Sequence, residues 1–381
     1  MADRPLTVVQ LIPALESGGV ERGTLEVAAE LVRRGHRSIV ISAGGKLVEQ
    51  LMAAGSEHVT WPVGNKSPRS LLQIPRLRRL LQQERVDILH ARSRVPAWLG
   101  WLAWRGMPVT RRPRFVTTVH GLYSVNAYSR IMTRGERVIA VSATARKYIL
   151  DNYPGVDPQS VITIYRGVER AKFPYGYRPD AAWLEHWYAL YPFLKDRKVL
   201  TLPGRLTRLK GHADFIGLMR GLVDQGMPVH GLIVGHLDPG RQQYIDDLKR
   251  TVTNEGLADR ITFTGQRQDI REIYTCSNIV LSLSRKPESF GRTVLEALCL
   301  GVPVVGYDHG GVGEILDALY PAGKVPLGDA GALLARTRQL LGRMEPVPAS
   351  QLFSLDGMLE QTLGVYTSLA DNKGAAAADG R

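Results

Sequence analysis

The feature that most constrains the fold is an alternation of short apolar strands with amphipathic helices. In the N-terminal half, runs rich in Val, Ile and Thr are separated by helical patterns, such as residues 20–34 closed by Gly35. The strand candidates there are residues 7–14, 37–43, 86–90, 114–121, 137–142 and 160–167. Such runs are typical of strands buried on both faces of a parallel sheet. The sequence therefore predicts βαβ units and an α/β fold.

The alternation stops and then starts again, which divides the chain. A segment rich in proline and aromatic residues interrupts it, and strand candidates return at 198–206, 229–235, 261–266, 278–284 and 303–308. Helical patterns cover about 212–225 and 239–253 in this half. We predict a domain over 1–168, a linker with a short helix over 169–197 and a second domain over 198–350. A C-terminal helix over 351–370 and a disordered tail over 371–381 follow.

Composition limits where the protein works. Two cysteines, Cys276 and Cys299, do not form a disulfide framework. There is no apolar run of membrane-spanning length and no signal peptide, so a cytoplasmic location is expected. The net charge is +13, and residues 69–114 hold eleven arginines against two acids. This local excess predicts a basic face for an anionic substrate, a polyanion or an anionic membrane.

Residues that follow the strands are the candidates for ligand binding, because ligands of parallel α/β sheets bind at the carboxyl ends of the strands. Gly18 and Gly19 follow the first strand and would allow a phosphate or sugar to approach a helix N-terminus. A tight turn explains them equally well. His120 follows a later strand and would serve as a hydrogen-bond donor or base, although a structural histidine is the simpler interpretation. No dinucleotide fingerprint or P-loop is present.

Two further groups lie in the C-terminal half. Arg205 and Lys210 share a glycine-flanked loop and suit a diphosphate, unless the loop is only solvated. Glu288 and Glu296 flank a segment with Phe290, Gly291 and Thr293, in which a glycine loop becomes a helix. The backbone N–H groups of the first helical turn can bind an anion. The spacing fits two ends of one nucleotide-sugar, and the paired carboxylates of a hydrolase are the competing interpretation.

No metal site is predicted. The chain has no D-x-D, and no His, Cys, Asp and Glu cluster has metal-ligand spacing. A diphosphate leaving group would then be neutralised by arginine, lysine and a helix dipole, with no cofactor.

With these motifs the sequence resembles glycosyltransferase family 4, the retaining nucleotide-sugar transferases of the GT-B fold. The resemblance spans nearly the whole chain. Its motifs match Gly18-Gly19-Val20-Glu21-Arg22, His120, Arg205, Lys210, the pair Glu288 and Glu296, and residues 295–316. One departure is Arg166 in "TIYRGVE", where the family more often has Asn.

The resemblance implies two Rossmann-like domains that face each other across the active-site cleft, and a last helix that returns to the first domain. It also implies that Glu288 contacts the donor sugar, that Glu296 contacts the ribose, and that backbone groups near "GQRQD", which includes Arg267, contact the base. We therefore expect retaining transfer from a nucleotide diphosphate-sugar, UDP-sugar favoured, to a lipopolysaccharide-core or other cell-surface glycan or glycolipid. A nucleotide-sugar epimerase of the same fold is the first alternative.

The arginine-rich segment also predicts partners. Trp98, Trp101 and Trp104 recur at three-residue steps and indicate a core helix, which leaves the arginines unexplained. Peripheral attachment to the inner face of the cytoplasmic membrane would explain them. A basic nucleic-acid-binding protein is a second alternative, but no stacking platform or recognised module is present, so no nucleic acid is expected.

Overall fold

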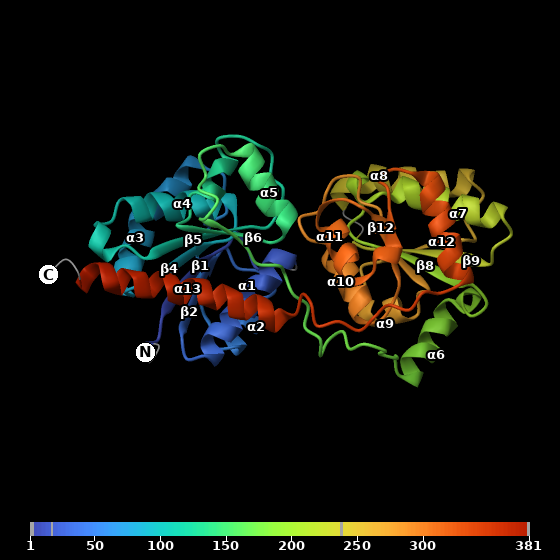
Figure 1. The fold of residues 1–381 in the computed structure, drawn as a ribbon, viewed down its shortest axis with the longest axis horizontal. Helices are drawn as coiled ribbons and strands as arrows, with labels where there is room; N and C mark the ends of the chain where they lie inside the picture. The colour runs from blue at the N-terminus through green and yellow to red at the C-terminus, as the bar shows by residue number, and fades with distance from the viewer. Residues whose placement is uncertain (1–3, 17, 237–238, 379–381) are drawn as a thin grey trace. The chain divides into compact units, whose positions relative to one another are not determined.

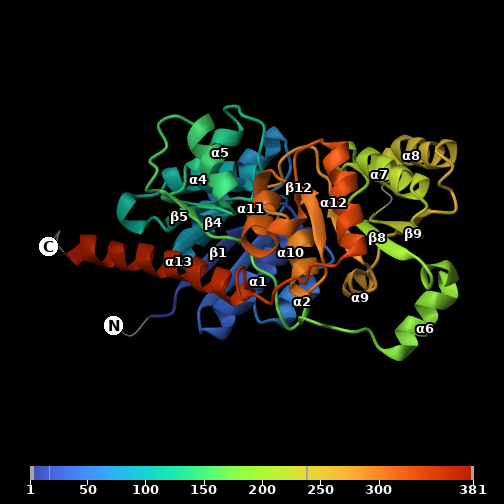
Figure 2. The same ribbon diagram turned by 45° about the vertical axis from the view of Figure 1, so that its right-hand side comes forward.

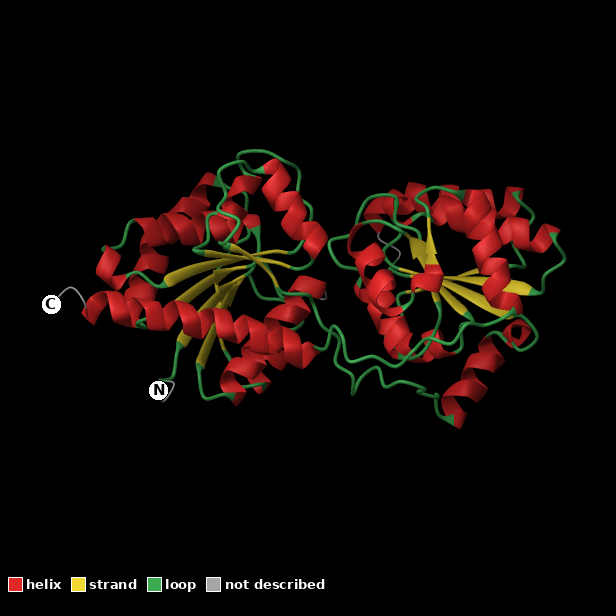
Figure 3. Cartoon of the chain, in the orientation of Figure 1, coloured by secondary structure: helices red, strands yellow, loops and turns green. Residues whose placement is uncertain are grey.

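A computed structural model describes residues 4–16, 18–236 and 239–378. The chain forms two compact units (Figure 1). Unit 1 comprises Met1–Tyr165 and Asp356–Arg381, and unit 2 comprises Arg166–Leu355. Each unit has a parallel sheet with helices on both faces (Figure 3), which confirms the α/β class that the strand and helix pattern predicted.

The sheet of unit 1 has seven parallel strands in the order β3-β2-β1-β4-β5-β6-β7. The strands are β1 Thr7–Leu11, β2 Arg37–Ser42, β3 Glu57–Thr60, β4 Ile88–Ala91, β5 Arg114–Val119, β6 Arg137–Ala140 and β7 Val161–Thr163. The helices are α1 Gly19–Arg33, α2 Val48–Ala53, α3 Gln73–Gln83, α4 Arg94–Arg105 and α5 Ala143–Asn152. The strand order reverses between β1 and β4, which is where parallel sheets open a ligand-binding crevice.

Strand β3 was not predicted. It has four residues at the edge of the sheet, and none of them is fully buried. An edge strand of this kind lacks the continuous apolar run by which the inner strands were recognised. The rest of the expected strands are present, most of them one to three residues shorter than expected.

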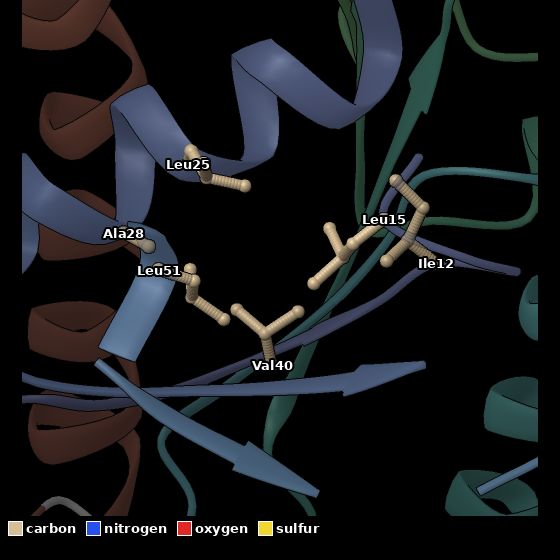
Figure 4. Close-up of a cluster of buried hydrophobic side chains, with 6 residues drawn as sticks. All are labelled: Ile12, Leu15, Leu25, Ala28, Val40 and Leu51. Carbon is tan, nitrogen blue, oxygen red and sulfur yellow. The ribbon is translucent and has the colours of Figure 1, made fainter. Parts of the chain in front are cut away.

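One part of the unit 1 core lies between α1, α2 and the sheet (Figure 4). It consists of Ile12, Leu15, Leu25, Ala28, Val40 and Leu51, all of them buried. Leu25 and Ala28 are three residues apart on α1, so they lie on one face of that helix. The packing fixes the start of α1 over the carboxyl ends of β1 and β2.

The last helix, α13 Leu355–Ala378, belongs to unit 1 and lies along its sheet (Figures 1 and 2). Its Tyr366 hydroxyl hydrogen-bonds to His90 Nδ1 at 2.6 Å, and Leu369 O accepts from Arg114 Nε at 3.0 Å. The predicted disordered tail is wrong for residues 371–378, which are helical. Four consecutive alanines favour continued helix there, and residues 379–381 lie outside the described part.

Unit 2 has six strands in the order β10-β9-β8-β11-β12-β13. They are β8 Lys198–Pro203, β9 Val229–Val234, β10 Ile261–Gly265, β11 Ile279–Ser282, β12 Val304–Tyr307 and β13 Lys324–Val325. The helices are α6 Ala181–Leu190, α7 His212–Asp224, α8 Gln242–Asn254, α9 Ile270–Thr275, α10 Arg292–Cys299, α11 Gly310–Leu319 and α12 Ala330–Gly342. The two-residue strand β13 was not predicted, because two residues carry no periodicity.

The segment predicted as a linker contains the expected short helix, α6, which packs on the core of unit 2. Trp187 is buried in a cluster with Leu194, Val199 and Ile273, among others. Trp183 stacks on Trp187 with 5.2 Å between the ring centroids. Trp183, Tyr188, Tyr191 and Phe193 pack partly buried against this cluster, so most aromatic residues around α6 belong to the core of unit 2.

Candidate active site

The carboxyl ends of β8, β11 and β12 lie side by side in unit 2, and the strand order reverses between β8 and β11. Lys210 lies in the loop after β8, Glu288 in the loop after β11 and His309 directly before α11. Ligands of open α/β sheets bind at such a reversal. The fold thus brings three titratable side chains, separated by up to 99 positions in the sequence, to one edge of the sheet.

Glu288 is held in place by its neighbours. Its Oε1 accepts a hydrogen bond from Lys210 Nζ at 2.7 Å and another from the Ser284 hydroxyl. Burial by itself raises the pKa of the Glu288 carboxyl, but the Lys210 ammonium and the hydrogen bonds outweigh it, so the pKa lies below its ordinary value. Glu288 is therefore an oriented carboxylate at neutral pH.

Two glycines let α11 approach the loop that carries Glu288. The Gly311 N–H donates to Glu288 O at 2.8 Å. A Cβ on Gly311 would lie 2.4 Å from Phe290 Cα, and one on Gly310 would lie 2.7 Å from Glu288 O. Gly310 also has a φ of +61°. His309 Nε2 donates to Ser284 O at 2.6 Å and adds a second tie between the two loops. The double glycine is thus a structural requirement for placing Glu288.

Helix α10 begins beside the same loop. Its N-cap, Gly291, has a φ of +108° and provides no side-chain cap. The first turn, which includes Thr293, therefore has N–H groups that a bound anion can use. Glu296 lies one turn into the helix and is almost fully buried, and its Oε1 accepts from Arg292 Nε at 2.9 Å. The carboxylates of Glu288 and Glu296 thus flank the start of one helix, the first before it and the second within it.

Three other predicted site residues in unit 2 differ in which of their groups a ligand could contact. The Arg205 side chain is exposed in the loop after β8. The Phe290 side chain is buried and packs on Phe353, so only its backbone can reach a ligand. Arg267 makes a bidentate ion pair with Asp269, at 2.8 and 2.6 Å. The Trp183 indole N–H donates to the same carboxylate at 2.9 Å, so Arg267 helps to hold α6 on unit 2.

The remaining predicted residues belong to unit 1. Gly18 is the N-cap of α1 and Gly19 its first residue. The missing side chain of Gly18 leaves room for the Glu21 carboxylate, since a Cβ would lie 2.2 Å from Glu21 Oε2. His120 directly follows β5 and is half-buried.

Ser284, His309 and Arg292 were not predicted as site residues. Each contacts a predicted carboxylate or the loop that carries it, through the hydrogen bonds given above. His309 had a recognisable signal, because it follows a predicted strand in the same way as His120 does. Ser284 and Arg292 had none, because an ordinary serine and an arginine at the start of a helix are common.

Two parallel α/β units, with a site at the carboxyl edge of the second, are the architecture of GT-B glycosyltransferases. Residues 17–172 match the model of Glycosyltransferase Family 4, and residues 190–342 match that of Glycosyl transferases group 1. The chain belongs to these glycosyltransferase families and is a glycosyltransferase.

Two curated relatives are similar in sequence. The N-acetyl-alpha-D-glucosaminyl L-malate synthase of Bacillus anthracis is 25% identical over 342 residues, which cover 86% of this chain and 85% of the relative. The lipopolysaccharide core biosynthesis mannosyltransferase LpsB of Rhizobium meliloti is 33% identical over 113 residues. That match covers 30% of this chain and 32% of LpsB.

Two solved structures share the fold. A glycosyltransferase from Rickettsia africae has a TM-score of 0.84 at 30% identity, covering 97% of this chain and all of that one. HepE from Anabaena, solved in complex with UDP and glucose, has a TM-score of 0.79 at 19% identity, covering 95% of this chain and all of HepE. In the described residues of this protein, no helix is long and apolar enough to span a bilayer.

Proposed function

We propose that this protein transfers a sugar, with retention, from a UDP-sugar to a hydroxyl of a lipopolysaccharide-core or other cell-surface glycan or glycolipid. The main observation in favour of a nucleotide-sugar donor is the oriented Glu288 carboxylate, which pairs with Lys210 beside the start of α10, where no side chain caps the helix. A carboxylate suits sugar hydroxyls, and a lysine with a helix N-terminus suits phosphates. The UDP and glucose in HepE support this choice of donor.

In this proposal the diphosphate binds between the start of α10, Lys210 and Arg205. Charge that develops on the leaving group is then stabilised by groups already in place, which is the largest contribution in many enzymes. Glu288 orients the sugar, and Glu296, held by Arg292, accepts from the ribose hydroxyls. Because Lys210 also holds Glu288, its loss would affect sugar orientation and phosphate binding together.

We further propose that no metal or other cofactor is required, because these cations and the helix dipole supply the positive charge that a diphosphate needs. Transfer should persist in excess EDTA. A loss of activity that magnesium or manganese restores would contradict this part of the proposal and leave the donor assignment standing.

The proposed acceptor is inferred from the exposed basic residues of unit 1 and from the relative LpsB, whose name assigns it to lipopolysaccharide core synthesis. We propose that the protein works in the cytoplasm and attaches peripherally to the anionic membrane face that carries such acceptors, with no nucleic-acid partner. Arg69, Leu72, Arg76 and Arg79 recur at steps of three or four and are all exposed. Leu72 is 75% exposed, which is unusual for leucine and suits contact with an interface.

The test is a transfer assay across UDP-sugars, with and without a glycan acceptor. Glu288→Gln should reduce turnover by about a hundredfold or more while UDP binds normally, because an oriented group is lost only from the sugar subsite. Glu296→Gln should weaken UDP binding itself. Equal loss of UDP affinity in both variants would refute the separate roles, and release of an epimerised sugar without any acceptor would favour the epimerase instead.

A further inference from the structure

A cluster of cations and tyrosines lies near the carboxyl edge of the unit 1 sheet and includes none of the residues assigned to the donor. Arg94, the first residue of α4, lies over the ring of Tyr123 at 4.6 Å and over that of Tyr128 at 5.2 Å. Lys66, in the loop after β3, lies over the Tyr128 ring at 5.8 Å. Two loops and the start of α4, which are separate in the sequence, therefore meet at one point.

The tyrosines are fixed by hydrogen bonds to their backbone. Tyr128 O accepts from the Trp98 indole N–H at 3.0 Å, and Tyr123 O accepts from the Tyr148 hydroxyl. Trp98 and Tyr148 belong to α4 and α5, which are regular helices packed on the sheet. The cluster is thus built on rigid elements, as a binding site requires.

Among the described residues, no carboxylate forms an ion pair with Lys66 or Arg94 of the cluster. The side-chain contacts of Arg94 within the described residues are the two rings and the Ser129 hydroxyl, at 3.3 Å. Arg92, at the end of β4, is buried, donates to Gln10 Oε1 at 3.0 Å and leaves Nε without a hydrogen-bond partner in the described structure. The loops that follow the first four strands (residues 12–18, 43–47, 61–67 and 92–93) contain Lys46, Lys66 and Arg92 against one acid, Glu16.

We infer that this cluster, Lys66, Arg94, Tyr123 and Tyr128, is the acceptor subsite and that the acceptor carries an anionic group, a phosphate or carboxylate, beside a sugar ring. A guanidinium that lies on aromatic faces keeps its N–H edge for an anion. Tyrosine rings provide flat apolar surface for a sugar ring, with hydroxyls at the edge. The inference rests on the proposed function, and it adds the chemical class of the acceptor.

The competing explanation is that Arg94 only fixes the loop 120–128 to α4. The two explanations differ in what they need from the side chain. An anion site needs the positive charge, which Arg94→Lys retains and Arg94→Met removes. Loop fixation needs the planar group over two rings, which both variants lack.

The experiment measures binding of glucose 6-phosphate and glucose by calorimetry to the full-length protein saturated with UDP, so that the donor phosphate positions are filled. We expect glucose 6-phosphate to bind at least about tenfold more tightly than glucose. Arg94→Met should weaken that binding by about tenfold or more, and Arg94→Lys by about threefold or less. The matched control is Arg105→Met, because Arg105 lies over Trp101 at 5.2 Å at the other end of α4.

The inference would be overturned by equal effects of the Arg94 and Arg105 variants. It would also be overturned if the two sugars bind equally or not at all and the vesicle arm below shows no preference either. A parallel arm uses vesicles with phosphatidylinositol or phosphatidylcholine. Preference for phosphatidylinositol that Arg94→Met abolishes would support the inference and assign the phosphate to a lipid headgroup. If UDP itself fails to bind, the proposed function fails together with the inference, whereas normal UDP binding without a phosphosugar or a phosphatidylinositol preference refutes the inference alone.

Discussion

At the scale of the residue, two buried tyrosines differ in whether the hydroxyl has a partner. Tyr274 OH has none within the described structure, whereas Tyr366 OH bonds to His90 Nδ1. A buried hydroxyl without a hydrogen-bond partner loses its hydrogen bonds to water and gains none from the protein. Tyr274→Phe should therefore leave the free energy of unfolding unchanged or raise it by about 1 kcal/mol. Tyr366→Phe should lower it by about 1–3 kcal/mol, because it leaves a buried imidazole nitrogen unpaired.

Urea unfolding of the two variants beside the wild type checks this. The same atom is removed from the same residue type in both, so packing losses are matched. Equal destabilisation would mean that the Tyr274 hydroxyl has a hydrogen-bond partner in solution, such as a buried water.

At the scale of the element, α11 places Glu288 through the glycine contact. Gly311→Ala should displace the loop 288–290, lowering stability by about 1–3 kcal/mol and transfer by tenfold or more, because small misplacements are costly in an active site. The control is Gly217→Ala in the exposed middle of α7, where a Cβ would meet nothing within 4 Å. That variant should gain about 0.5–1 kcal/mol, the usual difference between the two residues in a helix. Full transfer activity in Gly311→Ala would show that Glu288 does not depend on this contact.

At the scale of the whole molecule, the net charge of +13 predicts salt-dependent attachment to anionic vesicles. The protein should sediment with the vesicles at low salt and be released by about 0.5 M salt. At that salt concentration, charges interact over a distance of only a few ångströms because of screening. The double variant Arg69→Glu, Arg79→Glu should bind the vesicles tenfold or more weakly. The reason is that each basic residue near the membrane surface contributes about 1 kcal/mol to the binding free energy. Transfer to a soluble acceptor should not change.

The matched control is Arg338→Glu with Arg343→Glu, two exposed arginines in unit 2 that give the same change in net charge. If both double variants lose vesicle binding equally, attachment depends on net charge alone. Equal binding of the wild type to neutral and anionic vesicles would contradict an electrostatic attachment.

The sequence by itself determined the two α/β units and most of their strands and helices, because buried parallel strands and amphipathic helices carry strong local patterns. It also placed Lys210, Glu288 and His120 at the carboxyl ends of strands, since that position follows from the order of elements. It missed β3, β13 and the helical end of α13, where the local pattern is weak or short.

Only the tertiary structure decided which side chains meet. Lys210 and Glu288 pair because β8 and β11 are neighbours in the sheet although they are far apart in the chain. Arg267 forms an ion pair with Asp269, and the same carboxylate accepts a hydrogen bond from Trp183 of α6. The arginines of 69–114 do not form one face: Arg92 is buried, Arg94 lies on tyrosine rings and Arg114 pairs with Glu136, while Arg69 and Arg79 stay exposed. The net charge of a segment is the sum of its charged residues and can be counted from the sequence. The burial and the partners of each charged side chain depend on contacts between distant segments, which local sequence patterns do not record.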